Sequence, residues 1–292
     1  MKIIHSASRA AQVCRNSAGH PIVLVPTMGA LHAGHLSLIQ KARKLAREKG
    51  TVVVSIFVNP TQFGPGEDFS RYPRTFPQDR RLCEEAGVDL IFHPAPDDIY
   101  PPGFSTYVDE ERMSLVLCGK SRPGHFRGVC TVVLKLFNII APDIAVFGQK
   151  DYQQAAIIGE MVRDLNVPLR VVTAPTVREP DGLALSSRNV YLSPEQRAQA
   201  PVIRKALLLA RDAHSAHPDA LAKLVRKEIT AAPLAKIDYV EVLDAVTLEN
   251  PGPKTRELVI ACAVWFGKTR LIDNIRRKPQ KISRLPQHHA VR

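Results

Sequence analysis

Two histidines three residues apart, His32 and His35, stand directly after an apolar segment of the chain. The segment 22–25 has the β-branched, apolar character of a strand buried in a parallel sheet. A helix is predicted over residues 34–49 from the spacing of its apolar side chains. The start of a helix offers free backbone N–H groups and partial positive charge, which can bind a phosphate. Two imidazoles at that point could donate hydrogen bonds to charge that develops on a phosphoryl oxygen.

The same pair of histidines has two plainer interpretations, in which they only cap the helix or bind a metal ion. A structural metal site needs further ligands, and no third Cys or His lies at a matching spacing. Gly29 permits a tight turn between the strand and the helix, and Gly34 leaves space between the histidines. This context favours a nucleotide site over a metal site.

Polar residues follow two further predicted strands, 51–58 and 143–147. Ligands of parallel sheets bind beyond the carboxyl ends of the strands, so these residues should share one cleft. Lys150 could place its charge on phosphate oxygens. The amide of Gln62 could both donate to a carboxylate and accept from a hydroxyl, and Gln154 is expected to point into the same cleft. The alternatives are a structural Asn-Pro turn at Gln62 and a solvent-facing Lys150.

Three other groups of residues are weaker candidates. Ser186, Ser187 and Arg188 form a polar loop whose hydroxyls, N–H groups and guanidinium could wrap a triphosphate. Basic side chains precede the predicted helix 126–140 and could contact anions, or could simply form a basic surface loop. A carboxylate early in the predicted helix 77–86 could reach magnesium, although stabilisation of the helix dipole is the plainer explanation. These last candidates are Arg122, His125, Arg127 and Asp79.

The elements that must position these residues alternate between strand and helix over residues 1–176. Such alternation predicts an α/β fold, with a Rossmann-like doubly wound parallel sheet as a nucleotide-binding domain. Residues 93–108 are expected to form a surface connection and a strand. Residues 177–274 are expected to form a smaller α+β capping domain. It is predicted to contain helices over 194–213 and 219–231 and strands over 238–243, 258–266 and 270–272.

Composition limits the class of protein. The 292 residues carry a formal net charge of +12, and the segment 275–292 holds six Lys or Arg and no acid. This basic tail is expected to be disordered, which weakens a nucleic-acid interpretation of the total charge. No apolar run approaches the roughly 20 residues that span a bilayer, and no secretory signal is evident. The five cysteines are scattered without a C-x-x-C pair, which indicates reduced thiols in a cytoplasmic protein.

The pattern H-x-G-H after a strand resembles the signature of the HIGH-type nucleotidyltransferase superfamily. The whole set of motifs is similar to the pantothenate synthetase (pantoate–β-alanine ligase) family, in family order and spacing from about residue 22 to 274. The matching stretches are PTMGALHAGH, VSIFVNPTQF, RYPRT, SRPGHFRGV, FGQKDYQQ, DGLALSSRN and RLIDN.

This resemblance implies an AMP-forming amide ligase that condenses pantoate with β-alanine through a pantoyl adenylate, releasing AMP and pyrophosphate. The reaction belongs to vitamin B5 and coenzyme A biosynthesis. The resemblance also implies magnesium as cofactor and a cytoplasmic homodimer. The partners are then ATP, pantoate and β-alanine, with no nucleic acid and no membrane.

The resemblance also assigns roles to matching positions, and makes residues 1–176 a nucleotide- and pantoate-binding domain. His32, His35 and Lys150 are the catalytic residues, with His35 donating to the leaving pyrophosphate. Gln62 and Gln154 hold pantoate, Gln62 also lies near β-alanine, and Asp79 contacts the metal. The implied ATP site consists of Met28, Gly29, Ala30, Leu31, His32, Ala33, Gly34, His35, Gly148, Gln149, Lys150, Asp151, Val177, Leu185, Ser186, Ser187 and Arg188.

Two positions depart from the family pattern, since Gln149 and Gln78 stand where many relatives carry acids. The second departure weakens the metal assignment. Two other functions remain open: nucleotidyl transfer to a phosphorylated cofactor precursor, and RNA binding through the basic tail. The lack of an anticodon-binding domain or an aromatic-rich basic face argues against RNA binding.

Overall fold

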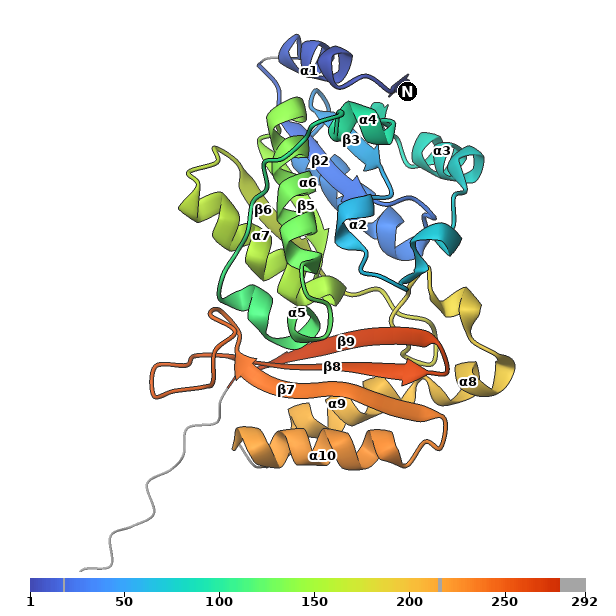
Figure 1. Cartoon of the computed structure of the whole chain (residues 1–292), viewed down its shortest axis with the longest axis vertical. Coiled ribbons are helices and arrows are strands. Elements are labelled where there is room, and N and C mark those ends of the chain that lie inside the picture. The colour runs from blue at the N-terminus through green and yellow to red at the C-terminus, as the bar shows by residue number, and fades with distance from the viewer. Residues whose placement is uncertain (18, 215–216, 279–292) are drawn as a thin grey trace, which may run out of the picture.

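A computed structural model describes residues 1–17, 19–214 and 217–278 of the chain. Its larger part is built on a six-stranded parallel sheet with the strand order β1-β4-β3-β2-β5-β6. The central strands are apolar on both faces because helices cover both, as Figure 1 shows. The strands of this sheet are β1 Lys2–Ile4, β2 Ile22–Thr27, β3 Thr51–Ile56, β4 Leu90–Phe92, β5 Ile144–Gly148 and β6 Arg170–Ala174.

The two faces of the sheet belong to two separate cores. Leu24 and Val53 point into a core formed with α1, α6 and α7. Val23 and Val52, their neighbours along the strands, point into the opposite core with α2 and α3. This alternation confirms the predicted doubly wound α/β sheet. The helices are α1 Ala7–Arg15, α2 Ala33–Ala46, α3 Phe76–Glu85, α6 His125–Ile140 and α7 Tyr152–Asp164.

Short elements connect these layers. The prediction of a strand within residues 93–108 is wrong. The segment contains the short helix α4 and otherwise irregular backbone, because its prolines limit strand pairing. The short helical elements are α4 Pro96–Ile99, α5 Leu117–Ser121, η1 Pro60–Gln62, η2 Asp68–Arg71, η3 Met113–Leu115, η4 Gln149–Asp151 and η5 Asn189–Tyr191.

The smaller part is a three-stranded antiparallel sheet, β7-β8-β9, with helices on its outer face (Figure 1). Its inner face contributes Tyr239, Val259 and Ala261 to the core shared with the larger part. The predicted helix 194–213 is in fact two helices, because Pro201 lacks the N–H that would continue the first. The elements are α8 Pro194–Gln199, α9 Val202–Asp212, α10 Pro218–Thr230, β7 Ala235–Asp244, β8 Leu258–Phe266 and β9 Thr269–Arg277.

Strand β9 extends past the predicted end of the domain at residue 274. Ile275 and Arg277 are buried, and the Arg277 guanidinium donates to the carbonyls of Ala210 and Ala213 at the end of α9. The assignment of residues 275–277 to a tail is therefore wrong. Residues 279–292 lie outside the described part of the chain, so their expected disorder remains a prediction.

Two expectations from composition can be compared with the structure. All five cysteines are buried and unpaired, as expected for reduced thiols. Within the described residues, no helix combines the length and apolar character needed to cross a membrane.

Candidate active site

His32 and His35 lie at the first turn of α2, just beyond the carboxyl end of β2. The Nδ1 atom of His32 accepts from the backbone N–H of Gly34 at 3.1 Å. The backbone N–H of His32 donates to Nδ1 of His35 at 3.3 Å. Because both Nδ1 atoms accept, each neutral ring carries its proton on Nε2, where it can donate to a ligand. The capping interpretation is therefore correct as well, and capping is what orients the two rings.

Gly34 is required by the packing of this turn. A Cβ atom at that position would lie 2.7 Å from Cε1 of His32, closer than van der Waals contact allows. The two imidazole rings lie beside each other with centroids 4.2 Å apart. The glycine in H-x-G-H thus permits the ring of the first histidine to fold over the start of the helix.

Burial sets the protonation state of both histidines. It lowers the pKa of His32 to about 4, and the positive charge of Lys150 lowers it further. Burial also lowers the pKa of His35 to about 3, with added repulsion from His32 and Lys150. Both rings are consequently neutral at pH 7 and present N–H donors rather than cations. Lys150 lines the same cavity as both rings.

The three predicted phosphate motifs meet in one cavity of about 220 Å³. His35, Lys150 and Arg188 come from three different segments, and all three line this space. Gly29, Ala30, Leu31, Ala33 and Gln149 do not line it. The predicted residues that line the cavity are Met28, His32, Gly34, His35, Gln62, Gly148, Lys150, Asp151, Gln154, Val177, Leu185, Ser186, Ser187 and Arg188, joined by Arg122 and His125.

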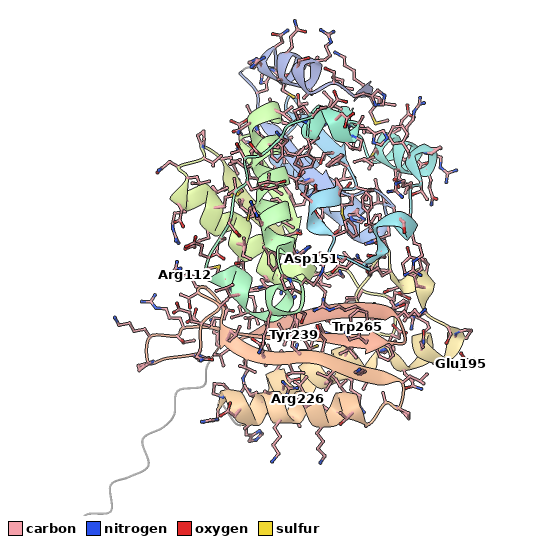
Figure 2. All side chains as sticks on the ribbon, in the orientation of Figure 1. Arg112, Asp151, Glu195, Arg226, Tyr239 and Trp265 are labelled. Carbon is pink, nitrogen blue, oxygen red and sulfur yellow. The ribbon has the colours of Figure 1, made fainter. Side chains whose placement is uncertain are left out.

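A second, larger cavity of about 730 Å³ adjoins the first and shares Lys150, Asp151 and Arg188 with it. Its opposite wall is the inner face of the small sheet, including Tyr239 and Trp265. Figure 2 shows Asp151 between the larger part and the small sheet that carries these two aromatic residues. The C-terminal sheet therefore closes one side of the cleft.

Asp79 does not lie in the cleft. Its side chain is 1% exposed, and its two carboxylate oxygens accept from the backbone N–H groups of Ala30 and Leu31 at 3.0 and 2.8 Å. The hydroxyl of Thr75 donates to the same carboxylate. Asp79 holds the loop between β2 and α2, and Gly29 passes so close to it that a Cβ would lie 3.0 Å from Oδ2. Its contact with a metal ion stays a prediction.

The two predicted substrate glutamines differ in how they are held. Gln62 is buried, with its Oε1 accepting from Asn59 and its Nε2 lying 3.2 Å from the sulfur of Met28. Gln154 lines both cavities, and no hydrogen bond of its side chain occurs within the described residues. Gln153, its neighbour, is instead committed to the backbone carbonyls of Met113 and Val116. Gln153 therefore has a structural role, whereas the side-chain amide of Gln154 is free to bind a ligand.

The cleft arginines are paired with two consecutive acids at the start of η2, its cap residue Glu67 and its first residue Asp68. Arg122 binds Glu67 through two hydrogen bonds of 2.7 and 2.6 Å. Arg188 binds Asp68 through two of 2.9 Å. These ion pairs hold the pKa of both carboxyl groups below their usual range against the opposing effect of burial. Sequence patterns offered no signal for Glu67 and Asp68, because their partners lie more than fifty residues away.

Asn274 is a second residue whose role the sequence alone did not reveal. Its Nδ2 group donates to the carbonyl oxygens of Gln149 and Lys150 at 2.9 and 3.0 Å. Strand β9 therefore fixes the turn that carries Lys150. Asn274 contacts the backbone carbonyl of Gln149 and not its side chain. This contact does not depend on the side chain at position 149, so it can form with a glutamine there.

Comparisons with known proteins agree with this geometry. The sequence profile of the family described as Pantoate-beta-alanine ligase matches residues 2–276. The chain belongs to this family. It is 56% identical over 260 residues to the pantothenate synthetase of Moorella thermoacetica, covering 88% of this chain and 91% of the relative. The pantothenate synthetase of Acetivibrio thermocellus is 51% identical over 280 residues, covering 94% and 99%.

Solved structures give the same result for the fold of this pantoate–β-alanine ligase family member. The pantothenate synthetase of Thermus thermophilus has a TM-score of 0.88 and 44% identity, covering 94% of this chain and 99% of that one. The Francisella tularensis pantoate–β-alanine ligase, solved with β,γ-ATP and β-alanine, has a TM-score of 0.76 and 36% identity, covering 94% and 97%. The expected fold and the expected ligase class are thereby confirmed.

Proposed function

We propose that the cleft joins pantoate to β-alanine in two steps that consume one ATP. In the first step, a carboxylate oxygen of pantoate attacks the α-phosphorus, the bond from that phosphorus to the bridging oxygen breaks, and pyrophosphate leaves. In the second step, the β-alanine nitrogen attacks the pantoyl carbonyl carbon. The bond from that carbon to the AMP oxygen breaks, the nitrogen loses a proton, and AMP and pantothenate are released.

Positioning and charge stabilisation account for most of the rate in such phosphoryl transfer. The Nε2–H groups of His32 and His35 are preorganised donors for phosphate oxygens, and Lys150 adds a positive charge beside them. Ser186, Ser187 and Arg188 supply donors from the opposite side of the same cavity. Because His35 is neutral at pH 7, it acts as a hydrogen-bond donor to the departing pyrophosphate until phosphate charge raises its pKa.

Pantoate and β-alanine are proposed to bind beside the α-phosphate, between Gln62 and Gln154. An amide can donate to the pantoate carboxylate and accept from its hydroxyl groups. The fixed orientation of Gln62, held by Asn59, would restrict pantoate to one geometry of attack. Gln62 would also lie beside the β-alanine amine in the second step.

Magnesium is proposed to enter with ATP. The described residues contain no group of three or more His, Cys, Asp or Glu side chains arranged to hold a metal. This arrangement fits an ion bound chiefly by triphosphate oxygens and water, with one or two protein carboxylates. Among the described cleft residues, Asp151 is an acid that no arginine binds, so it is the proposed protein contact. The bound ion would neutralise charge on the phosphates.

A cytoplasmic homodimer, which the resemblance implies, is part of the same proposal. Sedimentation of the purified chain would show one species of twice the chain mass of 32.3 kDa. A single species at the chain mass would contradict it.

The convergence of the His35, Lys150 and Arg188 motifs on one cavity carries the functional proposal. A substrate-omission assay tests it. Sustained AMP and pyrophosphate release should require ATP, pantoate and β-alanine together. Without β-alanine, a bound pantoyl adenylate should form without continued AMP release. Continuous release of AMP without β-alanine, or a final product that retains the nucleotide, would contradict the mechanism.

A further inference from the structure

A third cavity, of about 450 Å³, opens on the far side of the turn that carries Lys150. Four arginines line it, from α9, from β9 and from the segment that follows β6. They are Arg178, Arg204, Arg211 and Arg276. The cavity is separate from the proposed pantoate and β-alanine positions, since neither Gln62 nor Gln154 lines it.

Three of these arginines have acidic partners, and one does not. Arg178 binds Asp273, while Arg211 pairs with Asp212. Arg276 pairs with Glu257. Within the described residues, Arg204 has neither a carboxylate partner nor a hydrogen bond. Arg204 therefore has no direct partner in the described part of the chain, although the carboxylates of Asp273 and Asp212 attract its charge from a longer distance.

Arg204 is half-buried at the base of its side chain. Its stem packs against Gly182, where a Cβ would lie 3.1 Å from Cγ of Arg204. Burial lowers the pKa of Arg204, and the nearby positive charge of Arg178 lowers it further. Both effects would be relieved by an anion beside the guanidinium. An unpaired guanidinium that lines a cavity beside three other arginines is a candidate contact for an anion.

Thr176 lies between this cavity and the nucleotide cleft, because it lines both. Its hydroxyl is buried and has no hydrogen-bond partner in the described structure, and nothing about its position favours one space over the other. The arginines therefore carry the chemistry of the cavity. A guanidinium fork beside two neighbouring arginines presents the donors that phosphate groups bind in proteins.

We propose that Arg204, Arg211 and Arg276 form a second phosphate-binding site, distinct from the nucleotide cleft, for free phosphate or for the phosphate group of a small organic ester. Asn274, which also lines this cavity, donates to the Lys150 carbonyl, so one residue connects the proposed site with the turn that carries Lys150.

Modification of arginines by a dicarbonyl reagent, read at each residue by peptide mass spectrometry, tests this site in the full-length protein. Inorganic phosphate at about ten times its Kd should slow the modification of Arg204 about tenfold, because the reactive free form falls by the factor 1 + [phosphate]/Kd. Chloride at matched ionic strength serves as the reference. Arg80, an exposed arginine on α3, is the internal control and should be little affected. Equal slowing at Arg204 and Arg80, or none at Arg204, would overturn the proposal.

Two variants separate this site from the nucleotide cleft. The double variant Arg211→Gln/Arg276→Gln should lose phosphate protection of Arg204, whereas Lys150→Gln should keep it. The opposite pattern would place the phosphate in the cleft and refute the second site. Glycerol phosphate at the same concentration distinguishes the ligand source: stronger protection than by inorganic phosphate identifies an organic ester, and weaker protection identifies the free ion.

Discussion

At the scale of single residues, the chemistry of the site depends on which proton each imidazole carries. His32 and His35 use Nδ1 as an acceptor and are neutral. His125 has the opposite arrangement, because its Nδ1–H donates to the Gln62 carbonyl at 2.8 Å and its Nε2 accepts from Arg122. Backbone hydrogen bonds thus place the proton on Nε2 in His32 and His35 and on Nδ1 in His125. The first pair faces a ligand with N–H groups, and His125 supports the residue that holds pantoate in the proposed mechanism.

Replacing His35 with Ala should lower kcat by about 10²-fold, because one preorganised donor to the pyrophosphate is lost. Steady-state kinetics measure this effect. His20→Ala, at an exposed histidine outside the cavities, is the matched control and should leave kcat unchanged. A near-normal kcat for the His35 variant would remove this residue from the chemistry.

The pH dependence of stability provides a second test. Burial, reinforced by the charges of Arg122 and Arg188, lowers the pKa of His125 to about 4 despite the opposing Gln62 carbonyl and Glu67. As pH falls below about 6.5, the unfolded chain binds this proton first, so the folded state loses stability until about pH 4. The contribution between pH 7 and 5 is about 2 kcal/mol. Denaturant titrations of wild type and His125→Gln should show a smaller loss in the variant. An identical pH slope would contradict the assignment.

At the scale of elements, apolar runs predicted the buried strands well, because a strand covered on both faces must be apolar throughout. Helix starts were also predictable where a cap is local, as at Ser193, whose side chain and Gln196 form a capping box. The break between α8 and α9 was missed although Pro201 marks it. The role of Asp79 could not be predicted, because its partners are backbone groups almost fifty residues away that carry no sequence signal.

Asp79→Asn should destabilise the loop between β2 and α2, since the amide cannot replace both carboxylate acceptors. The free energy of unfolding should fall by about 1–3 kcal/mol. The KM for ATP should rise by the same factor at low and saturating magnesium, because the residue acts through the loop. A defect that high magnesium reverses would support Asp79 as a metal contact. Asp97→Asn, at an exposed position on α4, is the control for charge removal.

At the scale of the whole molecule, the topology explains why distant motifs meet. Parallel strands β2, β3 and β5 are neighbours in the sheet, so the residues after their carboxyl ends share one edge. This rule correctly predicted the cavity of His35, Gln62 and Lys150. It could not predict how the C-terminal sheet docks, because side-chain contacts such as Asn274 to the Lys150 turn decide that arrangement.

Asn274→Ala should weaken the connection between the two parts of the molecule. Loss of two hydrogen bonds to buried carbonyls should lower the free energy of unfolding by about 1–3 kcal/mol. The KM for ATP should also rise, because the turn carrying Lys150 is no longer fixed. Asn138→Ala, at an exposed position on α6, is the matched control. Calorimetry and kinetics measure both effects, and an unchanged KM would show that β9 does not position Lys150.

Glu67 and Asp68 neutralise two cleft cations before any substrate arrives. A substrate anion that binds Arg122 or Arg188 must replace the carboxylate that already pairs with it. The net gain in Coulombic attraction on binding is therefore small. The capture rate of ATP should therefore change only modestly with added sodium chloride, far less than the number of arginines suggests. Because charge then contributes little to binding, shape and hydrogen bonding should decide which ligand the pocket accepts. The anionic products should also dissociate readily.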